Sequence, residues 1–362
     1  MPKALPATRR TQTRRREQPK PEAAKEETMV TSRDVARVAG VSQATVSRAM
    51  LPQSRVNQAT IQRILAAMDE LGYVPNAAAQ TMKTGRTNTV GVVVADITNP
   101  FYPEILDALT RSFDEAGKRV IIWNSDGLHN KTAIEALGQG IIDGLVFTTI
   151  AEDSAELRNA VSAGYPIVMV NRYVAGLGCD QVRSQNAQGA ALVADHFLDH
   201  GRTRIGCISG PQSISTARER ESGFVDRLAA RGQALSPQYL RRGTFTHASG
   251  LNLIQELLGL EEPPDTFFCG NDLIAFGVLD YLRRVGLRVP ADVWVVGYDD
   301  IGLAAWDSFR LSTVRQHSTD MAREAARLLL KRIDDPTRPL EDICFPSALV
   351  LRETAGAVKQ GV

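Results

Sequence analysis

Hydrophobic positions change their spacing along the chain, and this change predicts two kinds of structure. In residues 57–72, apolar side chains recur at the three- and four-residue intervals of one helix face. They are Ile61, Ile64, Leu65, Met68 and Leu71. From Thr89 onward, short apolar runs such as TVGVVVA and VWVVGYDD alternate with longer helical stretches. Such runs are typical of buried parallel strands joined by helices, so a small helical domain followed by an α/β domain is predicted.

The residues before this helix, 31–50, read TSRDVARVAGVSQATVSRAM and have the pattern of a helix-turn-helix. Thr31 and Ser42 are suitable N-caps for two short helices, and Gly40 allows the tight turn between them. Helices of this length are not stable alone, so the following helix, capped by Asn57, is expected to complete a three-helix unit. A bundle used only for contacts is the simpler alternative, but outward-facing Gln and Arg side chains in the second helix favour DNA binding.

The α/β part is long for a single sheet. About eight predicted strands extend over roughly 270 residues, which exceeds one doubly wound lobe. RVIIWNS, DGLVFTT and PIVMVN are among these runs, and the expected helices include one from about Pro103 to Gly117. The predicted fold class is therefore a small all-α helix-turn-helix domain followed by a two-lobed, doubly wound, parallel-sheet α/β domain with a cleft between the lobes.

Charge is distributed unevenly between these parts. Residues 1–89 carry 15 Lys and Arg against 7 Asp and Glu, whereas the rest of the chain carries 27 against 34. A basic head on an acidic body fits nucleic-acid binding by the head. Residues 1–28 are rich in Pro, Arg, Glu and Thr and are expected to form a disordered basic extension. Its run of three arginines, 14–16, either adds salt-sensitive phosphate contacts or is simply a solvated tail.

Composition and motifs argue against membrane, secreted and enzymatic classes. The sequence contains no apolar run long enough for a membrane span and no apolar segment of a secretory signal. The four cysteines are scattered without a C-x-x-C pair, which favours reduced thiols in a cytoplasmic protein. Glycine motifs for dinucleotides or NTP and a G-x-S-x-G element are missing, and Phe197 stands where a zinc protease needs Glu between His196 and His200. We therefore expect no enzyme, no cofactor and no metal.

Ten motifs, in one order along the chain, resemble the LacI/GalR family of bacterial regulators. They are DVARVAGVSQATVSR, ELGYVPNAAAQTMKTGRT, TVGVVVADITNPFY, IDGLVF, PIVMVNR, STARERESGF, FFCGNDLIAFGVL, VWVVGYDDIGLA, LSTVRQ and VLRE. The resemblance implies a helix-turn-helix head with a periplasmic-binding-protein-like effector domain, acting as a homodimer on a pseudo-palindromic operator. It also implies that the chain crosses between the two lobes near Gln185, His317 and Phe345.

Pattern and resemblance together predict four segments. They are a disordered basic N-terminal extension (1–28), a helix-turn-helix DNA-binding domain (29–75), a hinge helix or linker (76–88), and a two-lobed effector-binding and dimerisation domain (89–362). The last residues contain no leucine heptads that would form a tetramerising coil, which favours a dimer.

The hinge segment departs from the family pattern at one informative place. By resemblance, it orders when two copies pair on operator DNA, and it inserts an apolar side chain into the minor groove. The family usually has Ala-Arg-Ser-Leu there, whereas residues 79–82 of this chain read AQTM. Met82 is then the apolar wedge, and Lys83 and Arg86 are expected close to phosphates.

The second helix of the helix-turn-helix carries the candidates for reading bases. Gln43 can make a bidentate pair with adenine, Arg48 can do so with guanine, and Ala44 can contact a thymine methyl group. Other polar side chains suit phosphate contacts, which set the register without reading sequence. They are Thr31, Ser42, Thr45, Ser47 and Asn57.

Polar residues follow several predicted strands, where open α/β sheets collect ligands. The resemblance places effector contacts on Phe101, Asn171, Arg220, Asn271 and Asp299, with Thr216 and Asp272 as further candidates. For Asp272 and Asp300, helix capping is an equal alternative to binding. Carboxylates and amides that pair with vicinal hydroxyls favour a sugar or sugar acid, while the same scaffold can also hold a purine or nucleoside.

The sequence therefore predicts a sequence-specific transcriptional repressor whose operator affinity is controlled by a small polar metabolite. Effector binding would change lobe closure and so shift the population of DNA-binding states. The alternatives are a solute-binding protein and a sugar-modifying α/β protein without a DNA role. The first is expected to carry an export signal and no basic head, and the second needs a nucleophile, metal or cofactor motif.

Overall fold

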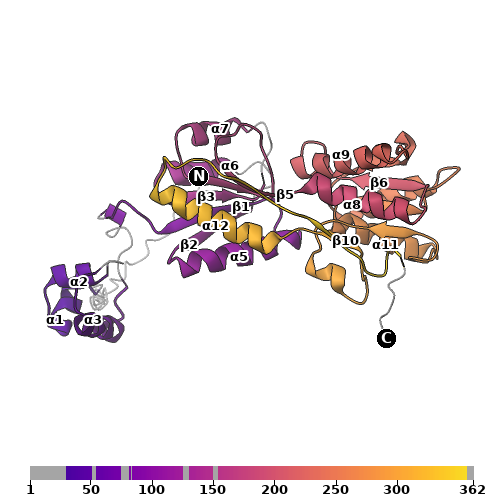
Figure 1. Ribbon diagram of the computed structural model, residues 1–362. Coiled ribbons are helices and arrows are strands. Elements are labelled where there is room, and N and C mark those ends of the chain that lie inside the picture. Colours follow the sequence, from indigo (N-terminus) through magenta and orange to yellow (C-terminus); the bar gives the residue numbers. More distant parts are fainter. Residues whose placement is uncertain are drawn as a thin grey trace, which may run out of the picture. The chain divides into compact units, whose positions relative to one another are not determined.

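The computed structural model describes residues 30–50, 54–74, 81–82, 84–124, 130–149 and 154–356 (Figure 1). Tertiary contacts divide the chain into two compact units, Met1–Ala77 and Ala78–Val362, which we call the head and the body. The predicted extension, 1–28, and the first part of the predicted hinge, 76–80, lie outside the described residues.

The described part of the head consists of three helices around a small apolar core. They are α1 (Ser32–Ala39), α2 (Gln43–Ala49) and α3 (Gln58–Leu71). Val35, Val46 and Ile64 are buried in this core, one from each helix. Leu65, expected on the inward face of α3, is 40% exposed because Ile64 and Met68 already occupy that side. The arrangement is the predicted helix-turn-helix with its supporting third helix.

Local hydrogen bonds set the helix ends of the head. The Thr31 N–H donates to Asp34 Oδ2 at 3.0 Å, which forms a capping pair at the start of α1. Ser42 Oγ and Asn57 Oδ1 each accept a backbone N–H in the first turn of their helices, at 3.1 and 2.9 Å. Gly40 ends α1 with φ 64°, a left-handed conformation that glycine adopts without strain and that produces the turn into α2.

The first lobe of the body is built on a six-stranded parallel sheet of order β11-β5-β4-β3-β1-β2. Its strands are β1 (Thr89–Val94), β2 (Arg119–Asn124), β3 (Gly144–Phe147), β4 (Ile167–Val170), β5 (Asp180–Ser184) and β11 (Asp342–Phe345). Its helices are α5 (Phe101–Glu115), α6 (Asn130–Gly138), α7 (Ala155–Ser162) and α12 (Ser318–Asp334). Val92 and Val146 pack with α5 and α12, whereas Val93 and Leu145 pack with α6 and α7, so helices cover both faces.

Two details of this lobe depart from the predicted pattern. α5 begins at Phe101 rather than Pro103, because Asn99 Oδ1 accepts from the Phe101 N–H at 3.1 Å and supports an earlier first turn. β2, expected to be a buried run, is the edge strand of the sheet, and its Ile121 and Ile122 are 36% and 45% exposed.

The second lobe repeats the same layered arrangement around a four-stranded parallel sheet of order β7-β6-β8-β9. Its strands are β6 (Ile205–Ser209), β7 (Leu240–Arg242), β8 (Thr266–Cys269) and β9 (Trp294–Val296), with β10 (Thr313–Arg315) and β12 (Ala348–Val350) forming a separate antiparallel pair. Its α-helices are α8 (Asn186–Asp199), α9 (Ser215–Ala230), α10 (His247–Leu258) and α11 (Asp272–Arg284), and the short 3-10 helices are η1 (Pro237–Tyr239) and η2 (Gly302–Ala305). α8 and α9 cover one face of the sheet, and α10 and α11 cover the other.

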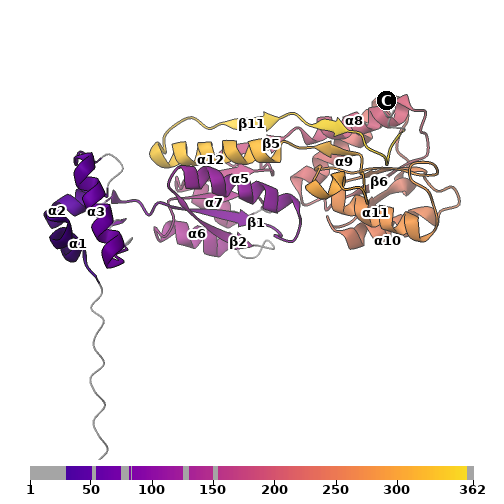
Figure 2. The same cartoon turned by 90° about the horizontal axis from the view of Figure 1, so that it is seen from below.

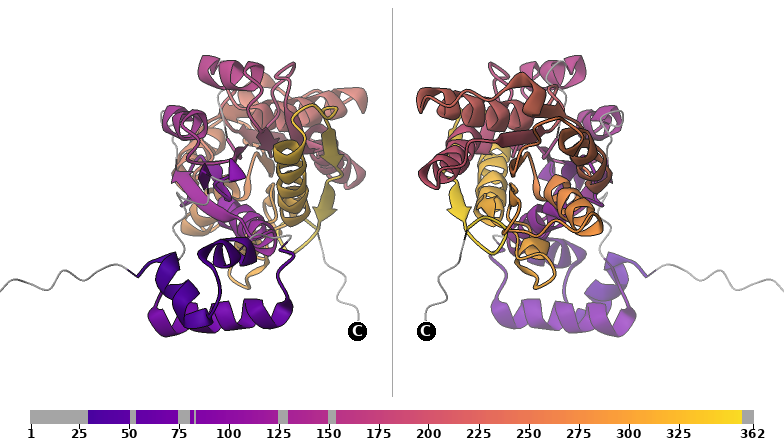
Figure 3. Two further views of the ribbon diagram at one scale, coloured as in Figure 1. Left: turned by 90° about the vertical axis from the view of Figure 1, so that its left-hand side faces the viewer. Right: turned by 90° about the vertical axis from the view of Figure 1, so that its right-hand side faces the viewer.

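The chain crosses between the lobes three times. The crossings join β5 to α8, β10 to α12 and β11 to β12, at the places predicted near Gln185, His317 and Phe345. As a result, α12 and β11 belong to the first lobe although they follow the second lobe in sequence, and they run side by side (Figures 2 and 3). The fold confirms the predicted two-lobed architecture.

Candidate DNA-binding surface and effector cleft

α2 separates its base-reading candidates from its core residue. Gln43, Ala44 and Arg48 are exposed, whereas Val46 is buried in the head core. Gln43 Nε2 donates to Ser32 Oγ at 2.8 Å, which ties the first turn of α2 to α1. The amide oxygen of Gln43 remains available to accept from a base, and pairing both amide atoms with adenine requires the contact to Ser32 to be exchanged.

The phosphate-contact candidates lie mostly at helix starts. Thr31, Ser42 and Asn57 are the N-caps of α1, α2 and α3, where unpaired N–H groups and the helix dipole attract anions. Thr45 Oγ1 lies 2.8 Å from Ser42 Oγ in the same first turn, and Ser47 is half-buried one turn further on. The N-terminal ends of these helices thus present several hydrogen-bond donors that suit phosphate oxygens.

The hinge candidates differ in what the structure shows of them. Met82 has a helical backbone and is 89% exposed, which is unusual for a large apolar side chain and fits a wedge that is buried only on DNA. Lys83 lies outside the described residues. Arg86, expected near phosphates, forms an ion pair with Asp334 of α12, with Nη1 and Oδ1 3.1 Å apart.

In the body, residues from both lobes line one small cavity, which we call the cleft. They are Asn99, Phe101, Tyr102, Asn171 and Arg172 from the first lobe and Thr216, Arg220, Phe245, Asn271 and Asp299 from the second. Six of the seven predicted effector residues are thereby brought together. The free space is about 20 Å³, enough for about one water molecule. The lobes also touch nearby, because the Gly302 N–H donates to Glu104 Oε1 at 3.0 Å.

Arg220 is the most tightly held side chain of the cleft and is 3% exposed. Its Nε donates to Asn186 Oδ1 at 3.0 Å, and its Nη1 donates to the Gly270 carbonyl at 2.8 Å. Its Nη2 lies 3.0 Å from Asp299 Oδ1, and the guanidinium carbon lies 3.8 Å from the ring centre of Tyr298. These contacts fix the planar group and so prepare it to recognise an oxygen-rich ligand.

Asp299, the partner of Arg220, occupies an unfavourable position in two respects. Its φ of 116° lies in a region that side chains rarely adopt, which is the kind of strain found at functional sites. Burial raises the pKa of its carboxyl group to about 6, although the charge of Arg220 and the hydrogen bond from Gln316 act in the opposite direction. Gln316 Nε2 donates to Asp299 Oδ1 at 2.7 Å.

Two asparagines complete the polar lining of the cleft. Asn171 is buried with φ 75°, and its Oδ1 finds no hydrogen-bond partner among the described residues. A buried acceptor without a partner costs stability, so this atom is a natural contact for a ligand donor. Asn271 is the N-cap of α11, and its Oδ1 accepts from the Ile274 N–H at 2.9 Å. Capping and binding are therefore compatible for Asn271, since its amide nitrogen can still donate.

Asp272, the seventh predicted contact, does not line the cleft. It is fully buried, with Oδ1 accepting from Thr313 Oγ1 at 2.5 Å and Oδ2 accepting from the Ile301 N–H at 3.0 Å. Burial raises the pKa of its carboxyl group well above the usual value. Asp300 forms an ion pair with Arg315 instead. The geometry gives both aspartates structural roles in the second lobe, because their oxygens are committed to its own loops and strands.

The sequence-based prediction missed Phe245 of the cleft lining and Gln316, which lies outside the lining but donates to Asp299. Phe245 lies in the turn before α10, where no periodic pattern marks it, and it brings a third aromatic ring to the lining beside Phe101 and Tyr102. Gln316 precedes α12 at a lobe crossing, and its only signal is its position between a predicted strand and a helix. Both depend on contacts between segments far apart in sequence.

Within the described ranges, no group of three or more His, Cys, Asp or Glu side chains is placed to hold a metal ion. Nor does any helix in that part of the chain have the length and apolar character needed to cross a membrane.

Comparison with known proteins identifies both units. Residues 31–76 match the model of bacterial regulatory proteins of the lacI family, and residues 194–355 match that of a periplasmic binding protein-like domain. The repressor CytR of Escherichia coli K12 is 35% identical over 86% of this chain and 92% of its own length. The repressor PurR of Photobacterium profundum is 31% identical over 90% of this chain and 98% of its own length.

Solved structures give the same result. A lac repressor dimer bound to operator and an anti-inducer matches with a TM-score of 0.80 and 27% identity, covering 91% of this chain and 99% of that one. A complex of the regulator CelR with cellobiose matches with a TM-score of 0.69 and 31% identity, covering 90% and 99%. These proteins are DNA-binding regulators rather than enzymes, which sets aside an α/β protein without a DNA role. The chain belongs to the LacI family of DNA-binding transcriptional repressors with an effector-binding domain.

Proposed function

We propose that this repressor acts in the cytoplasm as a homodimer on a pseudo-palindromic operator and that a sugar or sugar acid bound in the cleft controls its operator affinity. Residues 29–75 bind DNA in this proposal, with Gln43, Ala44 and Arg48 reading bases. Residues 76–88 form the hinge, and residues 89–362 bind the effector and dimerise. The small-molecule class is the step that goes beyond family membership.

The proposal for the effector rests on the geometry of the cleft. The Arg220–Asp299 pair offers donors and an acceptor side by side in a buried site, and Asn171 Oδ1 lacks a partner among the described residues. Neighbouring hydroxyl groups, which both donate and accept, match such a set. Aromatic rings from Phe101 and Phe245 add faces on which a sugar ring can stack. Cellobiose in the CelR complex and ribose in an Enterococcus faecium regulator, a structure with a TM-score of 0.67, support a sugar by analogy.

The effector is tested by a thermal-shift panel on the full chain with ribose, cellobiose, other sugars, sugar acids, nucleosides and purines. A ligand at about 100 times its dissociation constant adds roughly 2.7 kcal/mol of stability, which is a rise of a few degrees for a body of this size. We expect a sugar or sugar acid to produce this shift. Asn171→Ala should abolish the shift, and Ser112→Ala, near the C-terminal end of α5 and outside the cleft lining, should leave it intact.

Two outcomes of the panel contradict the proposal. A shift produced by purines or nucleosides alone would overturn the sugar class. A sugar-induced shift that survives Asn171→Ala and Arg220→Lys would place the binding site elsewhere.

The operator is tested by selecting duplexes from a randomised pool. The proposal expects a sequence with two related half-sites and an affinity that falls steeply with salt, because the head releases counterions from phosphates. Selection of single, unrelated sites would contradict homodimeric reading. Sedimentation of the full chain with the selected duplex gives the number of protomers directly.

A further inference from the structure

The segment that leads from the head to the body is clamped by one buried carboxylate. Asp143 accepts from the Thr87 N–H at 2.7 Å, from Thr87 Oγ1 at 2.9 Å and from the Asn88 N–H at 2.9 Å. The Asp143 side chain is 6% exposed, and Lys118 Nζ lies 3.7 Å away. Since Thr87 and Asn88 directly precede β1, these bonds fix the direction in which the linker leaves the first lobe. We call this contact the linker clamp.

The C-terminal half of α12 packs directly beside the linker clamp. Gly144 follows Asp143, and a Cβ atom added to it would come within 2.9 Å of both Leu329 and Ile333. The helix therefore lies against the backbone of Gly144 with no room for a side chain. One residue beyond Ile333, Asp334 pairs with Arg86 of the linker at 3.1 Å. The C-terminal end of α12 thus contacts the linker through Asp334 and packs against the residue that follows Asp143 in the clamp.

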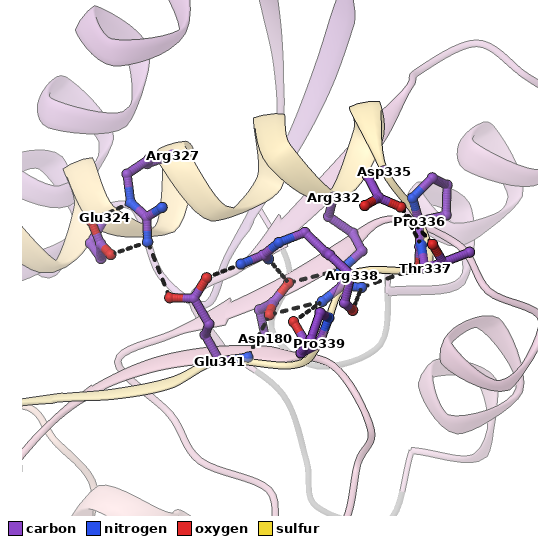
Figure 4. Close-up of polar contacts among 10 residues, drawn as sticks. All are labelled: Asp180, Glu324, Arg327, Arg332, Asp335, Pro336, Thr337, Arg338, Pro339 and Glu341. Carbon is purple, nitrogen blue, oxygen red and sulfur yellow. Dashed lines mark hydrogen bonds and ion pairs between the residues drawn. The ribbon is translucent and has the colours of Figure 1, made fainter.

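A buried ionic network fixes this end of α12 (Figure 4). Asp180, at the start of β5, is fully buried and accepts from Arg332 Nε and Nη2 at 3.0 and 3.1 Å. Arg338 Nη1 and the Glu341 N–H, in the loop between α12 and β11, donate to the same carboxylate at 3.2 and 2.8 Å. The loop and the last turn of α12 therefore share one buried partner, which restrains them together.

The other end of α12 reaches the effector cleft. Gln316, two residues before the helix, donates from Nε2 to Asp299 Oδ1, and its Oε1 has no hydrogen-bond partner among the described residues. The 17-residue helix is about 25 Å long, so it spans the first lobe from the cleft to the linker clamp. Gln316 shares Asp299 Oδ1 with Arg220, and an effector hydroxyl that binds this oxygen would compete with Gln316 for it.

We propose that α12 couples the cleft to the DNA-binding head. Gln316 contacts Asp299 at one end of the helix, and the packing of Leu329 and Ile333 on Gly144 positions the linker clamp at the other end. Gln316 and Asp143 are positioning residues in this arrangement, since neither has to touch DNA. The inference rests on the proposed function only in assigning Asp299 to the effector site. It connects two distinct sites through one packed element whose ends are both held by named contacts.

The test measures amide hydrogen exchange in peptides covering residues 84–89 of the full chain, without effector or DNA. Gln316→Leu removes the contact to Asp299 and should speed exchange of this segment at least about threefold, the effect of one modest lost hydrogen bond. Ser347→Ala is the matched control. It removes buried hydrogen bonds to Tyr298 and Ser184 at another lobe crossing but does not touch α12. It should leave residues 84–89 at the wild-type rate. Asp143→Asn weakens the linker clamp directly and therefore gives the exchange rate of residues 84–89 that a loosened clamp produces.

The proposed coupling through α12 is overturned if residues 84–89 exchange at the wild-type rate in Gln316→Leu. It is also overturned if Ser347→Ala raises their exchange rate equally. The urea midpoint of each variant shows whether it is folded, and Gln316→Glu, which places a second carboxylate against Asp299, replaces Gln316→Leu if that variant is unfolded. Because the readout needs neither a sugar nor an operator, it is independent of the proposed function. If a sugar raises the thermal stability but Gln316→Leu leaves the exchange of residues 84–89 unchanged, only the coupling through α12 is refuted. If exchange becomes faster but no sugar produces a thermal shift, only the proposed effector class is refuted.

Discussion

The proposed recognition helix and the proposed effector cleft are built in opposite ways. α2 is a seven-residue helix whose candidate base-reading side chains are exposed and whose stability comes from local caps and a single buried valine. The cleft collects buried polar groups from segments far apart in the chain, and it includes two residues with positive φ, Asn171 and Asp299. The head therefore loses little stability by carrying its function, whereas the body carries charge and strain inside its core.

Because of this difference, substitutions should separate function from folding on α2 but not in the cleft. On α2, a side chain can be removed with a loss of DNA affinity and almost no loss of stability, because water already solvates it. In the cleft, removing one member of a buried pair leaves the other without its partner, and the free energy of unfolding falls.

The largest effect is expected for Arg220→Met. The substitution leaves the Asp299 carboxylate buried without its partner, which should lower the free energy of unfolding by about 3–5 kcal/mol. Urea unfolding of the full chain measures it. Asp299→Asn in the same chain removes the orphaned charge and should recover much of the loss. A loss below about 1 kcal/mol would mean that the cleft behaves like an exposed surface, and the contrast would fail.

The second effect is a pH dependence that belongs to Asp299. Its pKa is raised from 3.8 to about 6 in the folded protein, so folding favours the protonated form. The resulting stabilisation is complete below about pH 4 and is lost as the pH rises through 6, an amount of up to about 3 kcal/mol. The unfolding free energy of wild type minus that of Asp299→Asn, measured from pH 4.5 to 7.5, should fall as the pH rises through 6. A constant difference would contradict the proposed burial cost.

The third effect concerns DNA rather than folding. Arg48→Ala should weaken binding to the selected operator by about 1–3 kcal/mol and relax preference at one base position. Its urea midpoint should stay near that of wild type, because Arg48 is exposed. Arg63→Ala, at an exposed position of α3, controls for the loss of one positive charge and should not change base preference. Full affinity and unchanged preference in Arg48→Ala would show that α2 is not the recognition helix.

The smallest effect is expected at a helix cap. Ser42→Ala removes the acceptor for the first turn of α2 and should cost the head about 1 kcal/mol of stability. Hydrogen exchange of α2 in the full chain measures it, with Ser112→Ala in the body as a control. Ser42→Gly should lose only a few tenths of this amount, because glycine is tolerated at the cap. Equal losses in both variants would point to a contact other than capping.

The head could be predicted almost completely from its sequence because its determinants are local. Thr31, Ser42 and Asn57 cap the helices that their positions indicate, and Gly40 makes the predicted turn. Among the described residues of the head, the prediction for Leu65 was wrong. It was expected on the inward face of α3 but is exposed, because Ile64 and Met68 occupy that side. The two lobes and their crossings also followed from apolar runs and the family resemblance.

The cleft was harder to predict, because its chemistry depends on distant contacts. Position after a strand marks Asp272 and Asp299 alike, yet Thr313 and the backbone of Ile301 hold Asp272 inside the lobe. Phe245 enters from a turn without a periodic pattern, and Gln316 is selected only by how a lobe crossing approaches Asp299. The edge position of β2 was likewise invisible, since strand order is a property of the assembled sheet.

The small volume of the cleft has a kinetic consequence. A cavity of about 20 Å³ cannot admit a sugar ring, so the proposed binding of a sugar in the cleft requires the lobes to part first. In stopped-flow mixing, the observed rate should therefore approach the rate of opening as the ligand concentration becomes saturating. The measured dissociation constant exceeds the intrinsic one by the inverse of the open fraction. Substitutions of the Glu104 contact to Gly302 should raise the rate of opening even though neither residue lines the cleft.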